Sequence, residues 1–166
     1  MFVNVNFHTN PGKVGETVRY VAHREEKLPE GRTREIYGIG PRYKELRGDE
    51  KAIVRRLRTD AEGIREPHFF RFKFTVDDAA ARRLLALPAQ YREWAIRDAL
   101  EKTFGGAFRT AQGVFVIHYH GGARRPFGHP HAHVLLSPRP LDGVALQYIP
   151  RPRLARIKER WRWHLL

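Results

Sequence analysis

Four stretches of the chain are predicted to be strands, and in two of them, residues 2–8 and 68–76, hydrophobic and polar residues alternate as in a strand that buries one face. The clearest stretch is HFFRFKFTV, residues 68–76, in which Phe70, Phe72 and Phe74 share one face while Arg71 and Lys73 lie on the other. The remaining stretches are residues 2–8, 113–120 and 131–137. The pattern therefore predicts four strands, one of them with a basic face.

Apolar residues at helical spacing predict helices between these strands. Val14, Val18 and Val21 form a stripe that indicates a helix from about residue 15 to residue 26, and Asp49 is suited to cap a second helix. Further helices are predicted for residues 77–104, interrupted at Pro88 and ended by Gly105-Gly106, and for the basic amphipathic tail LARIKERWRWHLL.

Residues 28–48 are rich in glycine, proline and charge, and we expect an irregular basic loop there around a short apolar piece. No internal repeat or linker interrupts the order of elements. The sequence therefore predicts a single α+β domain over residues 1–166, an antiparallel β-sheet with helices mainly on one face.

The charge of the chain changes this picture, because it indicates a partner. Lysine and arginine total 31 against 18 acidic residues, giving a net charge of +13, and arginine outnumbers lysine 24 to 7. Such a surplus is typical of proteins that bind nucleic acid, and the forked guanidinium suits phosphates. The chain has no cysteine, no apolar run of membrane-spanning length and no export signal. We therefore expect a cytoplasmic protein with no thiolate metal site and no membrane association.

The histidines are the most unusual feature of the sequence. Five of the nine lie between residues 118 and 133. Because side chains alternate along a strand, His118 and His120 share one face, and His131 and His133 share a face of the next predicted strand. If the two strands are neighbours, imidazoles from both can bind one divalent cation and leave positions open for water or substrate.

The segments VIHYH and HPHAHVLLS resemble the HUH motif of DNA-nicking relaxases of the plasmid-mobilisation and T-DNA border type. The resemblance implies an HUH-endonuclease fold and a metal held by His118, His131 and His133. His120 stands where that family usually has aspartate, and it is an alternative third ligand. His129, before the proline, flanks the site.

The resemblance also implies a tyrosine nucleophile on the first helix after the first strand. Tyr20 stands there, in RYVAHRE, and a helical wheel turns it away from the valine stripe. Tyr148 is the alternative, because circularly permuted relatives carry the tyrosine after the HUH strand. The proline-rich context after Tyr148 makes a poor start for the helix that this reading requires.

The reaction that the resemblance implies is attack of Tyr20 on a phosphodiester of single-stranded DNA at an origin of transfer, giving a 5′-phosphotyrosine and a free 3′-hydroxyl. A bound Mg²⁺ or Mn²⁺ would polarise the scissile phosphate, and relaxosome accessory proteins are expected partners. The candidate DNA-binding residues are Arg24, Arg42, Lys44, Arg71, Lys73, Arg124 and Arg125, with Tyr37, Tyr43 and Phe127 as candidates for base stacking.

Three other readings stay open at this point. One is a permuted HUH transposase or replication initiator that uses Tyr148. Another is a histidine-triad nucleotide hydrolase, although Pro130 fits poorly inside the strand that such a motif needs. The last is a non-catalytic, basic DNA-binding accessory protein whose histidines bind metal only structurally.

Overall fold

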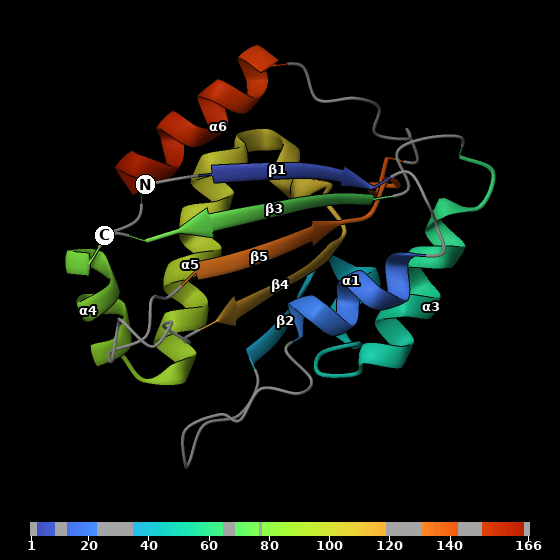
Figure 1. Cartoon of the computed structure of the whole chain (residues 1–166), viewed down its shortest axis with the longest axis horizontal. Coiled ribbons are helices and arrows are strands. Elements are labelled where there is room, and N and C mark those ends of the chain that lie inside the picture. The colour runs from blue at the N-terminus through green and yellow to red at the C-terminus, as the bar shows by residue number, and fades with distance from the viewer. Residues whose placement is uncertain are drawn as a thin grey trace.

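The protein is described from a computed structural model, which covers residues 3–8, 13–22, 35–64, 69–76, 78–118, 131–142 and 151–164. Its centre is a five-stranded antiparallel sheet in the order β1-β3-β5-β4-β2 (Figure 1). The strands are β1 (Val3–His8), β2 (Glu35–Ile39), β3 (Phe69–Thr75), β4 (Gly113–His118) and β5 (His131–Leu136).

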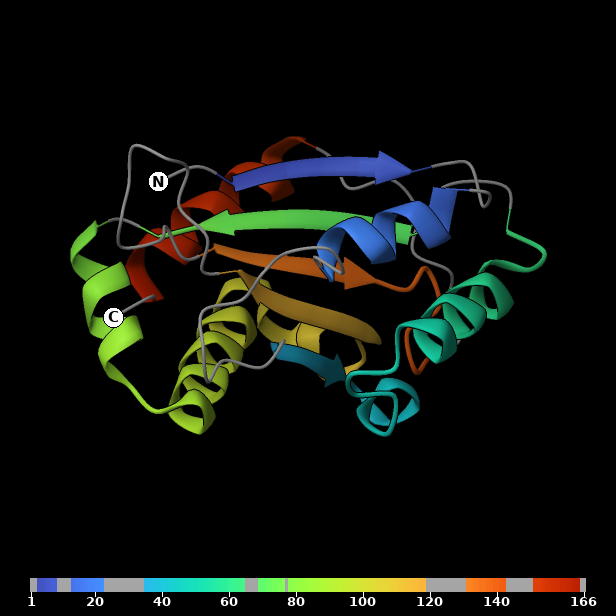
Figure 2. The same cartoon turned by 60° about the horizontal axis from the view of Figure 1, so that its bottom comes forward.

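The helices cover both faces of this sheet (Figure 2). They are α1 (Val14–Val21), α2 (Pro41–Lys44), α3 (Glu50–Ala61), α4 (Asp78–Ala86), α5 (Ala89–Phe104) and α6 (Arg151–His164), with the 3₁₀-helix η2 at Gly105–Arg109. Helices α4, α5 and α6 pack on one face, and α1, α2 and α3 pack on part of the other. The α+β class is confirmed, and the second group of helices brings α1 over the face that carries the histidines.

Two apolar clusters hold these layers together. The larger one joins Phe70, Phe72 and Phe74 of β3 to the helices behind the sheet, as their alternation predicted. Helix α6 is anchored there by Trp161, whose ring lies 4.6 Å from that of Phe74 and whose Nε1–H donates to the Thr75 carbonyl over 2.9 Å. The basic tail is therefore part of the core packing on its apolar side.

Several local signals in the sequence act as predicted. The side chain of Asp49 accepts a hydrogen bond from the Ala52 amide over 3.0 Å and caps α3. Pro88 separates α4 from α5, and Gly105, with φ of +65°, ends α5.

Two expectations about irregular segments are wrong. Residues 35–39, EIYGI, lie inside the segment that we expected to be a loop, yet they form β2 and pair with β4. Helix α6 begins at Arg151, with Pro152 in its first turn, so the prolines after Tyr148 are compatible with a helix start. A proline in a first turn costs little, because that amide has no helical acceptor.

Candidate active site

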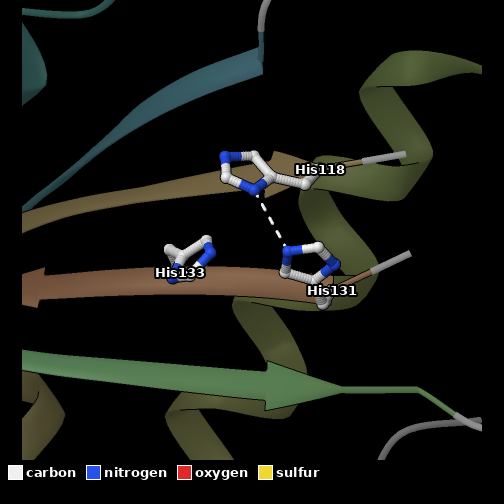
Figure 3. A group of neighbouring side chains, drawn as sticks. All are labelled: His118, His131 and His133. Atoms are coloured by element: carbon white, nitrogen blue, oxygen red, sulfur yellow. Dashed lines mark hydrogen bonds between the residues drawn. The ribbon is translucent and has the colours of Figure 1, made fainter. Parts of the chain in front are cut away.

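The three histidines that the sequence singled out converge from two neighbouring strands. His118 ends β4 and His131 begins β5, and the antiparallel register pairs them directly, while His133 lies opposite Val116. All three side chains are buried, with exposures of 3%, 6% and 1%. Figure 3 shows the three imidazoles gathered above β4 and β5. The register thus brings one histidine of β4 and two of β5 to the same point.

The geometry of this group suits a divalent metal ion. One ring nitrogen from each histidine lies within 4.8 Å of the others. Nitrogens about 2.1 Å from a tetrahedral ion lie roughly 3.4 Å apart, so small side-chain rotations bring the three onto one ion. Nδ1 of His118 is already 3.1 Å from Nε2 of His131. Neutral imidazoles are common ligands of transition metals, and three of them leave positions open for other oxygen ligands.

A backbone carbonyl orients His118. Its Nε2–H donates a hydrogen bond to the Val21 carbonyl at the end of α1. Because the proton is then on Nε2, the lone pair of the neutral ring is on Nδ1, which faces His131. This hydrogen bond fixes the orientation of the His118 ring from the end of α1.

Tyr20 lies on α1 beside the histidines. Val14, Thr17, Val18 and Val21 are the buried face of this helix, and Tyr20 points away from them with 55% of its surface exposed. Its ring centroid is 6.0 Å from that of His133, in an edge-to-face arrangement. The wheel prediction is therefore confirmed, and the exposed Tyr20 ring lies next to the three histidines.

Two cations of β3 extend the site. Arg71 pairs with Leu135 and Lys73 with His133 in the sheet register, so both side chains lie on the histidine face. The Arg71 guanidinium is 5.3 Å from the centroid of the Tyr20 ring. Among the described residues the group that could hold a metal ion contains only the three histidines and no carboxylate. The site is thus rich in positive charge and suited to an anionic substrate such as a phosphodiester.

The other predicted DNA contacts divide into three groups. Lys44 is exposed on α2, whereas Arg42 forms an ion pair with Asp60 over 3.4 Å and also donates to the Arg139 carbonyl. Tyr37 and Tyr43 are buried, with 2% and 0% exposure, so they cannot stack on bases as we expected. The residues Arg24, Arg124, Arg125, Phe127, His120, His129 and Tyr148 lie outside the described part of the chain.

Sequence reasoning missed a buried polar cluster at the end of β5. Asp60 accepts hydrogen bonds from the Tyr43 hydroxyl and the Ser137 hydroxyl, each over 2.7 Å. Burial, and then the hydrogen bond to Asp60, raises the pKa of Tyr43 well above its usual range. The sequence did contain an indication that Asp60 is buried. It falls seven residues after Ile53 and therefore lies on the apolar stripe of α3.

Comparisons with known proteins relate this geometry to a family of solved structures. No family model matches the chain, and no curated protein matches it in sequence. Among solved structures, it is similar to the conjugative relaxase TrwC in complex with oriT DNA. The metal-bound form has a TM-score of 0.58 and 17% identity over 99% of this chain and 69% of that one.

Two further TrwC structures agree with this match. The metal-free complex with oriT DNA has a TM-score of 0.59 at 16% identity. The complex with a 27-mer DNA comprising the recognition hairpin and the cleavage site has a TM-score of 0.59 at 15% identity. Each match covers 99% of this chain and 67% of the other. No helix among the described residues is long and apolar enough to cross a membrane. The chain has the fold of a conjugative relaxase.

Proposed function

We propose that this chain is a metal-dependent, site-specific single-stranded DNA endonuclease and strand transferase, a relaxase-like domain over residues 1–166. It would act in the cytoplasm at the origin of transfer of a plasmid or conjugative element, together with accessory proteins. The observation that carries the proposal is the 6.0 Å separation of the Tyr20 and His133 rings. An exposed tyrosine thus lies beside a group of three buried histidines, on a fold similar to that of TrwC.

In the proposed reaction the phenolic oxygen of Tyr20 attacks the phosphorus of the scissile phosphodiester. A P–O bond to tyrosine forms, the P–O3′ bond breaks, and the products are a 5′-phosphotyrosine and a free 3′-hydroxyl. The phenolic proton passes to water, which the exposure of Tyr20 allows, and the 3′ oxygen takes up a proton. Because one phosphodiester replaces another, the 3′-hydroxyl can later attack the phosphotyrosine and reseal the strand.

His118, His131 and His133 would hold the divalent ion, Mg²⁺ or Mn²⁺, and nitrogen ligands favour Mn²⁺ of the two. When bound, the ion supplies positive charge that polarises the scissile phosphate and orients it for in-line attack. Arg71, beside the Tyr20 ring, would neutralise the negative charge that gathers on the phosphoryl oxygens.

DNA binding would extend from this point over the basic residues. Lys73, paired with His133 in the register, borders the site, and Lys44 is exposed on α2. Arg24, Arg124 and Arg125 remain candidate contacts on the sequence pattern alone. Arg42, through its ion pair with Asp60, would support the fold more than the DNA.

A covalent-capture experiment tests the proposal. A labelled library of single-stranded DNA with randomised sequence is incubated with the protein and Mn²⁺, and adducts that survive denaturation are recovered and sequenced. We expect an adduct that disappears in Tyr20→Phe and persists in Tyr91→Phe. Tyr91 is the matched control, because it is 53% exposed and lies on α5, on the other side of the sheet.

Other results would assign a different function. Loss of the adduct only in Tyr148→Phe would support the permuted reading. Hydrolysis of adenylated nucleotides without any adduct would support the nucleotide hydrolase, and binding of DNA without cleavage would support the accessory protein.

A further inference from the structure

A basic groove lies between α1 and α3, the two helices that stand side by side in Figures 1 and 2. It encloses about 360 Å³ and is separate from the histidine group. Its walls are formed by Gly15, Val18 and Arg19 of α1 and by Glu50, Lys51, Val54, Arg55 and Arg58 of α3. None of these residues belongs to the site described above.

Two features of the sequence shape the groove: a glycine on α1 and a row of cations on α3. Gly15 has no side chain, and a Cβ atom there would lie 3.4 Å from a guanidinium nitrogen of Arg58. Lys51, Arg55 and Arg58 are spaced at i, i+4 and i+7, so they form a row along one face of α3. Arg19 faces them from α1, which gives the groove cations on both walls.

The positive charge of this groove is available to an external anion. All four cations are exposed, and Glu50 is the single carboxylate in the lining. Within the described ranges no ion pair involves Arg19, Lys51, Arg55 or Arg58. On α5, by contrast, Arg97 and Lys102 are paired with acidic residues one helical turn earlier. Four cations against one carboxylate, around an open groove, fit a chain of phosphates better than a single small anion.

The groove shares α1 with the proposed nucleophile. Successive residues of a helix are about 100° apart, so Tyr20 and Arg19 lie on different flanks of α1. Tyr20 faces His133 and Arg71, and Arg19 faces α3. A helix with its side chains is about 10–12 Å across, so a strand that leaves Tyr20 and crosses α1 reaches the groove within a few nucleotides.

We propose that this groove binds phosphates of the DNA segment on the 3′ side of the nick, the segment that becomes attached to Tyr20. The inference rests on the proposed function. The segment that ends in the 3′-hydroxyl stays with the histidines and Arg71, whereas the tyrosine-linked segment leaves along α1 and is held by Arg19, Lys51, Arg55 and Arg58. Holding both segments keeps the two ends together for resealing.

The test compares two DNAs that share the captured cleavage sequence. One ends two nucleotides after the nick and the other continues for ten, and both are bound by the non-cleaving Tyr20→Phe protein. We expect the added double substitution Arg55→Ala/Arg58→Ala to weaken binding of the long DNA about tenfold and to spare the short one. The dependence of log Kd on log salt for the long DNA should fall by about 1.4, which corresponds to two lost phosphate contacts on a single strand.

The control is Arg82→Ala/Arg109→Ala, which removes the same charge from exposed positions on α4 and η2. Equal weakening of both DNAs, or the same effect in the control, would overturn the inference, because the groove would then act only through overall charge. Unchanged binding of both DNAs would also overturn it, and an acidic protein surface would then be the better candidate for the partner that binds the groove. Adduct formation by the protein with Tyr20 intact is scored separately. If no DNA gives an adduct, the proposed function fails and the inference fails with it.

Discussion

Asp60 is the residue whose removal best tests how the histidine strand is held. Its Oδ2 accepts from the Tyr43 and Ser137 hydroxyls at 2.7 Å and lies 3.4 Å from Arg42. Its backbone carbonyl accepts from Nε of Arg139 over 2.9 Å. Ser137 directly follows β5, so this cluster connects α2 and α3 to the strand that carries two of the candidate metal ligands.

The cost of Asp60→Ala can be worked from these contacts. The substitution leaves the hydroxyls of Tyr43 and Ser137 buried without an acceptor, at about 1–3 kcal/mol each. The pair with Arg42 adds about 0–1 kcal/mol, because that side chain is 31% exposed and water screens the charge. These contributions sum to about 2–7 kcal/mol, and breaking a buried ion pair typically costs about 3–5 kcal/mol. We therefore expect a loss of about 3–5 kcal/mol and a fall in Tm of roughly 6–20 °C for a chain of this length.

Urea denaturation followed by circular dichroism measures this loss. The control is Asp98→Ala, which removes an exposed i,i+4 pair with Lys102 and should cost about 0.5 kcal/mol or less. A double-mutant cycle of Asp60→Ala with Tyr43→Phe should give a coupling free energy of about 0.5–3 kcal/mol. The reasoning would be refuted if Asp60→Ala were within about 1 kcal/mol of the unaltered protein, because the cluster would then not support β5.

Three further predictions follow from the packing and the site. The raised pKa of Tyr43 means that the folded state holds the phenolic proton more tightly than the unfolded state. The contribution of this proton to the free energy of unfolding is therefore complete below pH about 10 and is lost as the pH rises further. The free energy of unfolding should therefore fall less steeply above pH 10 in Tyr43→Phe than in the unaltered protein; parallel curves in urea titrations would contradict this. Gly38→Ala should destabilise the fold by about 1–3 kcal/mol or more in the same titrations, because the new Cβ would lie 2.3 Å from the carbonyl oxygen of Tyr43; an unchanged midpoint would contradict the close approach. Mn²⁺ at a hundred times its Kd should stabilise the protein by about 2.7 kcal/mol in thermal melts, reversibly with a chelator. His133→Ala should abolish this shift and Tyr20→Phe should keep it; a shift that survives in His133→Ala would place the metal elsewhere.

The sequence by itself determined the elements whose cause is local. Alternation defined β3, because side chains on a strand point to opposite faces whatever lies around it. A cap at Asp49 and a break at Pro88 were readable for the same reason, since each acts on its own backbone. The direction in which Tyr20 points on α1 also has a local cause, because it follows from the position of the valine stripe on the same helix.

Tertiary structure decided how these elements meet. The residues of β2 are a short apolar piece inside a segment of loop-like composition, and their pairing with β4 makes them part of the sheet. His118 could be joined to its partners only through the register that sets it opposite His131, and the Val21 carbonyl that orients it comes from a segment 97 residues earlier in the chain. The burial of Tyr43 depends on Asp60 and Ser137, two residues from other elements. Local pattern specifies which face a side chain occupies, whereas its partners depend on contacts between segments that are distant in sequence, and no local pattern records those.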